Sequence, residues 1–121
     1  KKFYEITLSK NSQNIHIRRR LFHINYDNLE FSNYKEVNKI YESYNDLIFN
    51  YSNDINFYYK WLNLFQALEK KDWEIFVDAL ILIINKDKNT AILKLEEIIK
   101  ISNNSKLIYN TNKLIYQIKD V

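Results

Sequence analysis

The sequence predicts a mostly α-helical α+β fold, with an N-terminal β-hairpin packed on about five antiparallel helices. Apolar residues recur at three- and four-residue steps from Asn33 onward, which is the period of an amphipathic helix. In the first thirty residues they alternate with polar ones, which is the period of a strand. The length of 121 residues suits one domain with a buried core, so we expect a single domain over 1–121. Within it, residues 1–30 form the hairpin region and residues 33–121 the helical bundle.

The predicted hairpin has two strands joined by a polar turn. Tyr4, Ile6 and Leu8 point to one face of the first strand, and Ser9–Asn14 supplies the turn. The second strand covers Ile15–Tyr26. A helix over this last segment is the alternative, and it would make the whole fold an all-α bundle.

The helical part begins at Asn33, which forms a capping-box pattern with Glu36, and its first apolar stripe continues to Tyr51. The second helix, Ile55–Lys70, is apolar on nearly every side and is expected at the centre of the domain. Short polar breaks then separate three further helices, over Trp73–Asn85, over Thr90–Ser102 and from Ser105 onward.

The chain contains no glycine, proline, cysteine or methionine. It therefore has no Gly-rich phosphate loop, nucleophile elbow, thiolate metal site or disulfide. We expect a protein that is not an enzyme and that needs no cofactor or metal. Asparagine is expected to take the left-handed backbone positions that glycine usually fills. The frequent lysine, asparagine, isoleucine and tyrosine residues all have AT-rich codons, which indicates an AT-rich genome.

The ends of the chain and its hydropathy leave the compartment undefined. No initiator methionine is present, so the chain is expected to be a processed product or an excised piece, and removal of an upstream targeting or anchor segment is one of the alternatives. The longest apolar run, Ala79–Ile84, is far too short to span a bilayer, so we expect this piece to be soluble.

The C-terminal half contains a pattern of small and large residues over two helices. Small or apolar residues alternate with large ones at three- and four-residue steps, at Ile75, Ala79, Leu82, Ala91, Leu95 and Ile98. This spacing resembles one repeat of the tetratricopeptide family, which often has proline at the position of Asn103. Asp78 departs from the family pattern, because leucine is expected there. The resemblance implies a scaffold that binds peptides or proteins. An ordinary antiparallel helical hairpin is the alternative.

Every arginine of the chain lies in the run Arg18, Arg19 and Arg20, between His16 and His23. Guanidinium groups bind phosphate, and neighbouring aromatic rings can stack on bases, so the run is a candidate nucleic-acid contact. The alternative is an edge strand protected from aggregation by its charges. The modest net charge of +3 favours it, because one short basic cluster would bind nucleic acid weakly. The two histidines have no helical metal-ligand spacing.

Tyrosines are concentrated in the first two helices, and Tyr34, Tyr41, Tyr44 and Tyr51 are the candidate partner surface. Tyrosine buries a large area and keeps a polar end, which makes it common in interfaces. The sequence therefore predicts a non-enzymatic protein–protein interaction module, whose partner is another protein or a second copy of the chain. Nucleic-acid binding through the arginine run is the alternative function.

Overall fold

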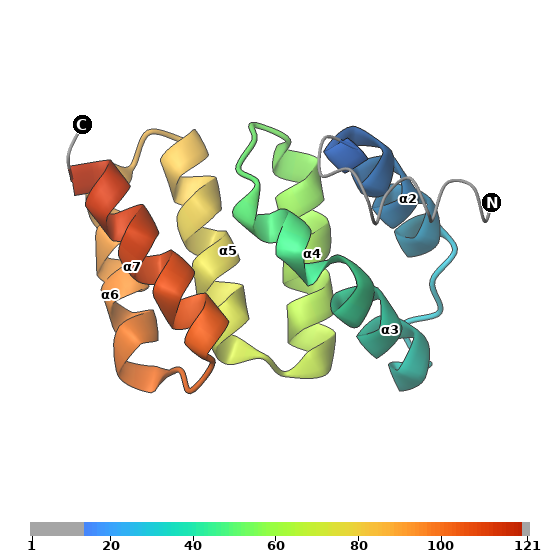
Figure 1. Ribbon diagram of the computed structural model, residues 1–121. Helices are drawn as coiled ribbons and strands as arrows, with labels where there is room; N and C mark the ends of the chain where they lie inside the picture. The colour runs from blue at the N-terminus through green and yellow to red at the C-terminus, as the bar shows by residue number, and fades with distance from the viewer. Residues whose placement is uncertain (1–13, 120–121) are drawn as a thin grey trace. The chain divides into compact units, whose positions relative to one another are not determined.

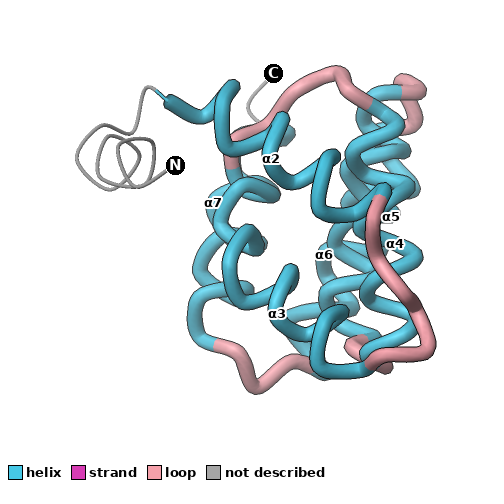
Figure 2. The backbone as a smooth tube through the Cα atoms, turned by 90° about the vertical axis from the view of Figure 1, so that its right-hand side faces the viewer, coloured by secondary structure: helices cyan, strands magenta, loops and turns pink. Residues whose placement is uncertain are grey.

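The computed structural model describes residues 14–119, and the chain divides into two compact units, Lys1–Tyr51 and Ser52–Val121, here called unit 1 and unit 2. All regular secondary structure in the described residues is helical (Figures 1 and 2). The prediction of a mostly helical chain is confirmed, and for residues 14–119 its all-α form holds. Each unit is described by itself, so the single domain over 1–121 stays a prediction.

Unit 1 contains helix α2 (Ile15–Asp27), helix α3 (Tyr34–Tyr44) and the 3-10 helix η2 (Asn45–Phe49). Helix α2 contacts both of the others. The ring of Phe22, which is fully buried, meets the ring of Tyr44 edge to face with 5.9 Å between centroids. This aromatic pair joins α2 to α3.

The predicted second strand over Ile15–Tyr26 is wrong, because this segment is helix α2. In a helix, Arg18 and Arg19 lie on the same side as the buried Phe22, at positions where a helical pattern usually has apolar residues. Because two charged residues occupy these positions, the remaining apolar residues resemble the alternation of a strand. The predicted first strand, over residues 3–8, lies outside the described residues.

Helix α3 begins as predicted and ends early. The backbone amide of Glu36 donates to Oδ1 of Asn33 at 3.4 Å, and Nδ2 of Asn33 donates to Oε2 of Glu36 at 2.7 Å. The predicted helical stripe to Tyr51 is interrupted after Tyr44, where η2 begins. The side chain of Asn45 donates to a backbone carbonyl one turn earlier at 2.9 Å, which competes with helix continuation.

Unit 2 contains four helices, α4 (Ile55–Leu68), α5 (Lys71–Ile84), α6 (Lys88–Ile101) and α7 (Ser105–Lys119). Links of two or three residues join them, so consecutive helices run antiparallel (Figure 1). Helix α5 packs against α4 and α6, and α6 packs against α5 and α7. These helices agree with the predicted segments to within a few residues at each end.

A column of aromatic rings along α4 continues into α5. The ring of Trp61 lies 6.3 Å from that of Phe57 and 5.1 Å from that of Phe65, centroid to centroid. The ring of Phe65 lies 5.5 Å from that of Trp73. All four side chains are buried, which confirms that this apolar helix belongs to a core.

The left-handed backbone positions of the described residues are Glu69 and Lys86, with φ of 55° and 68°. They end α4 and α5, and the amide of the residue after each, Lys70 or Asp87, donates to a carbonyl of the preceding helix at 3.0 and 2.8 Å. This is the Schellman arrangement, which places a left-handed residue just after the helix. The expectation that asparagine takes these positions is wrong, since Asn85 keeps a φ of −84° one residue earlier.

Replacing Glu69 with glycine should stabilise the protein. A left-handed conformation costs a residue with a Cβ about 1–2 kcal/mol, and glycine regains part of this after its larger loss of chain entropy. We expect Glu69→Gly to raise the free energy of unfolding by up to about 1 kcal/mol in urea titrations. Glu97→Gly, on the exposed side of α6, is the control and should lower it by about 1 kcal/mol. Destabilisation by both would contradict the role of Glu69.

Candidate functional site

The four tyrosines predicted as a partner surface have different environments. Tyr34 is 62% exposed and Tyr51 is 42% exposed, whereas Tyr41 is half-buried. Tyr44 is also half-buried, and its hydroxyl accepts a hydrogen bond from the side chain of Asn25 at 2.9 Å. Because Tyr44 bridges α2 and α3, these four residues do not present one common exposed surface.

The arginine run makes hydrogen bonds within unit 1. Arg18 donates through Nη1 to Oδ2 of Asp46 at 2.6 Å and through Nη2 to its Oδ1 at 2.8 Å. Nη2 also donates to the backbone carbonyl of Ser43 at 3.0 Å. The side-chain hydrogen bond to Asp46 raises the pKa of Arg18 above its usual value, against the opposing effect of burial. This bidentate pair ties α2 to η2.

The other two arginines differ from Arg18. Nη2 of Arg19 donates to the backbone carbonyl of Asn50, so this side chain also binds within unit 1. Arg20 is exposed. Two of the three guanidinium groups therefore bind within unit 1, and the arginine run does not present three free cations on one surface.

The histidines of α2 belong to no cluster of metal-binding side chains among the described residues. His16 and His23 are two helical turns apart on one side of α2, and the ring of Phe22 lies 5.5 Å from that of His23. Within residues 14–119, no group of three or more histidine, aspartate or glutamate side chains is arranged to hold a metal ion.

The acidic residues at the start of α5 accept hydrogen bonds from residues of two different elements. Oδ2 of Asp72 accepts a hydrogen bond from the hydroxyl of Ser102 at 2.7 Å, and Oε2 of Glu74 accepts one from Gln66 at 3.2 Å. Asp72 is inside α5 and does not cap it, because the helix begins one residue earlier. These carboxylates therefore join α5 to α6 and to α4, and do not form a pair.

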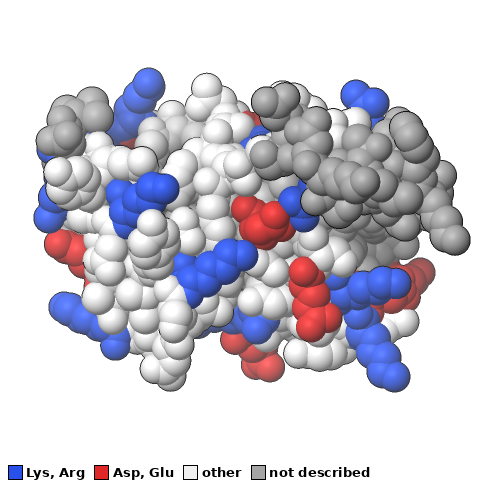
Figure 3. Space-filling view, in the orientation of Figure 1, with Lys and Arg blue, Asp and Glu red and all other residues white. Residues whose placement is uncertain are grey.

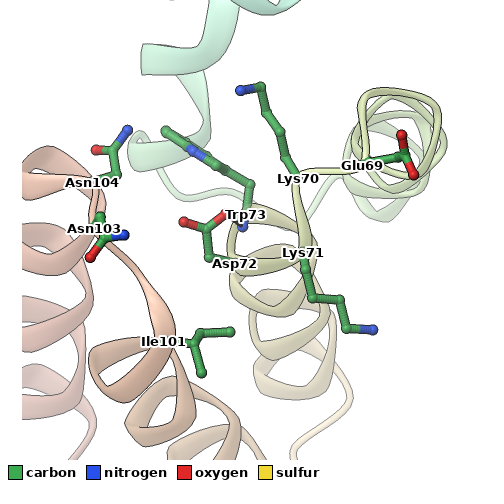
Figure 4. A pocket seen from close by; sticks show the side chains of 8 residues that line it. All are labelled: Glu69, Lys70, Lys71, Asp72, Trp73, Ile101, Asn103 and Asn104. Atoms are coloured by element: carbon green, nitrogen blue, oxygen red, sulfur yellow. Dashed lines mark hydrogen bonds between the residues drawn. The ribbon is translucent and has the colours of Figure 1, made fainter.

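A shallow hollow lies at this end of unit 2, between the α4–α5 link and the α6–α7 link (Figure 4). Figure 4 shows the carboxylate of Asp72 directed toward the α6–α7 link, whereas Lys71 extends away from it. Eight residues line the hollow: Glu69, Lys70, Lys71, Asp72, Trp73, Ile101, Asn103 and Asn104. It is open, and Asp72 is already engaged by Ser102, so we interpret it as a junction between helices.

This junction positions helix α7. The hydroxyl oxygen of Ser102 accepts a hydrogen bond from the amide of Asn104 at 3.1 Å. Oδ1 of Asn104 accepts one from the amide of Leu107 at 2.9 Å, and so caps α7, which begins at Ser105. At the far end, Nζ of Lys119 lies 3.7 Å from Oε2 of Glu96 on α6. Helix α7 is thus attached to its neighbour near both ends.

Helix α7 buries one side and exposes another that is rich in aromatic residues. Its buried stripe is Leu107, Thr111, Leu114 and Ile118. On the exposed side, Tyr109 and Tyr116 are 66% and 73% exposed. Asn112 and Lys113, also exposed, lie between them. We call Tyr109, Asn112, Lys113 and Tyr116 the α7 face.

The α7 face is a continuous surface over two helical turns. Tyr109 and Tyr116 are seven residues apart, so their side chains leave the same side of the helix about 10 Å apart along its axis. Figure 3, in the orientation of Figure 1, shows lysine side chains among uncharged ones where α7 comes to the front of unit 2. Two exposed tyrosines with a lysine between them can contact a partner through rings, hydroxyl groups and charge.

The residues of the α7 face were not among those predicted from the sequence. The signal was present, since both tyrosines lie off the apolar stripe of this helix, where polar residues are usual. Residues 34–59 contain more tyrosines, and this pattern favours a surface on the first two helices.

Of the helices in the described part of the chain, none is both long and apolar enough to cross a membrane. No known protein family, curated protein or solved structure matches this chain, and its function has to be inferred from its own residues.

Proposed function

We propose that the chain is a non-enzymatic protein-binding module and that its partner docks on the α7 face. The observation that carries this proposal is the exposure of Tyr109 and Tyr116 on one side of a single helix. Tyrosine is enriched at interfaces because it supplies a large contact area with few rotatable bonds. Two such side chains on one side of a helix are available to a partner.

The arrangement of unit 2 supports the same proposal. Its helices contact their neighbours along the sequence, as in repeat scaffolds that bind other proteins. The small residues Ala79 and Ala91 are fully buried on α5 and α6, as are Leu95 and Ile98. This is what the resemblance to a tetratricopeptide repeat implies for that hairpin, and it also suits any close helix pair.

We place the binding surface on α7 and not on the tyrosines of unit 1. Tyr44 is held by Phe22 and Asn25, and its removal would disturb the packing of unit 1. Tyr109 and Tyr116 are more exposed than Tyr34 and share one side of their helix.

Affinity capture with three forms of the chain tests the proposal. Wild type, Tyr109→Ser/Tyr116→Ser and the control Tyr34→Ser are immobilised and exposed to an extract of the source cells. We expect a protein that wild type and Tyr34→Ser retain and that the double variant retains about tenfold less, as loss of two interface aromatics implies. Circular dichroism should show the same helix content in all three.

Three results would contradict the proposal. Equal retention by wild type and the double variant would remove the α7 face as the binding surface. Loss of the partner from Tyr34→Ser alone would move the surface to unit 1. Retention of no protein by any form would speak against a protein-binding module.

A further inference from the structure

We infer that the partner segment that docks on the α7 face is acidic and amphipathic, with apolar side chains that contact the two tyrosines and a carboxylate that pairs with Lys113. This inference rests on the proposed function and adds the chemistry of the partner. It follows from the charges of unit 2, from the position of Lys113 and from the spacing of the tyrosines.

Charge is distributed unevenly along unit 2. Residues 88–119, which include α6 and α7, contain six lysines and two glutamates. Residues 52–87 contain four lysines and six acidic residues. Helix α7 itself has lysines at 106, 113 and 119 and no acidic residue. Because Lys113 lies on the α7 face and no acidic residue lies within Ser105–Lys119, the face favours a negative partner.

Lys113 makes this preference specific to the α7 face. It follows Tyr109 by four residues and precedes Tyr116 by three, so any segment that covers both rings also covers this lysine. A neutral or basic segment would bury the ammonium group without a counter-charge, which is unfavourable. A carboxylate opposite Lys113 removes that cost.

The tyrosine spacing indicates what else the segment carries. Two rings about 10 Å apart along the helix axis suit two apolar side chains of the partner at a similar separation, as on one side of an amphipathic helix. The carboxylates then lie between or beside these apolar residues. A purely acidic segment would leave both rings without apolar contacts.

A nucleic acid is the main competing class of partner. It would need cations in register with successive phosphates, whereas the centre of the α7 face is occupied by Tyr109, Asn112 and Tyr116 with one lysine. The face therefore favours an acidic protein segment, and an oligonucleotide serves as a competing probe.

Fluorescence anisotropy tests the inference with three fluorescein-labelled probes: an amphipathic helical peptide of glutamate and leucine, the same peptide with lysine in place of glutamate, and oligothymidylate. The full chain is compared with Lys106→Glu/Lys113→Glu, with Tyr109→Ser/Tyr116→Ser, and with Lys35→Glu/Lys39→Glu. The last variant makes the same charge change on exposed positions of α3.

We expect the glutamate peptide to bind wild type and to bind the α7 charge variant about tenfold more weakly, while the α3 control changes little. The tyrosine variant should weaken binding by a similar factor. The α7 charge variant should also gain affinity for the lysine peptide, because the sign of the face is reversed.

Several results would overturn the inference. These are absence of binding to the glutamate peptide, equal weakening by the α3 control, or tighter binding of oligothymidylate. Sedimentation that shows self-association, abolished by the α7 charge variant, would make a second copy the occupant. If the capture experiment still finds a tyrosine-dependent protein partner while the glutamate peptide fails, the acidic partner is excluded and the proposed function stands.

Discussion

Trp61→Ala should lower the free energy of unfolding of unit 2 by about 3–5 kcal/mol. The indole is fully buried and lies between the rings of Phe57 and Phe65. Truncation removes its apolar burial, interrupts the aromatic column and leaves a cavity that neighbouring helices fill only in part. The fluorescence of Trp73, which is buried in the same unit, reports the transition in urea.

Tyr59→Ala is the matched control for this prediction. Tyr59 lies on the same helix two residues before Trp61 and is 49% exposed. Its truncation should change the free energy of unfolding by about 0.5 kcal/mol, as for most surface substitutions. Similar unfolding midpoints for the two variants would mean that the column does not carry the stability assigned to it.

Much of this fold can be predicted from the sequence, because its helices bury continuous apolar stripes. The segment Ile55–Leu68 is so rich in large apolar residues that only a buried helix suits it. Asn33 and Asp54 each accept the amide three residues later, and this cap pattern is readable in the sequence.

Two of the wrong predictions concern charged residues at positions that a pattern rule assigns to other residue types. Arg18 lies on the inner side of α2 because Asp46, distant in sequence, neutralises it. Glu69 takes the left-handed position that ends α4, which pattern rules assign to glycine or asparagine.

The candidate site was less predictable than the fold. Which tyrosines are exposed depends on which side of each helix its neighbours cover, and this is a tertiary property. Tyr34 and Tyr44 lie on the same helix, α3, yet Tyr44 contacts α2 whereas Tyr34 is 62% exposed.

Arg18→Ala should lower the free energy of unfolding by about 1–2 kcal/mol. The guanidinium group makes two hydrogen bonds to Asp46 and one to the Ser43 carbonyl, and its side chain is 24% exposed. Because Asp46 is 45% exposed, water replaces part of the lost interaction and keeps the cost below that of a fully buried pair. Urea titration followed by circular dichroism measures it.

The exposed neighbour Arg20 provides the control and separates a structural from a binding role. Arg20→Ala should change stability by about 0.5 kcal/mol or less. The cost of Arg18→Ala should shrink when Asp46→Ala is already present, because the two substitutions remove the same pair. A full cost in that background would contradict the pairing.

Replacing all three arginines would confuse loss of folding with loss of nucleic-acid binding. Arg20→Ala alone, measured against an oligonucleotide at low salt, therefore tests the nucleic-acid alternative.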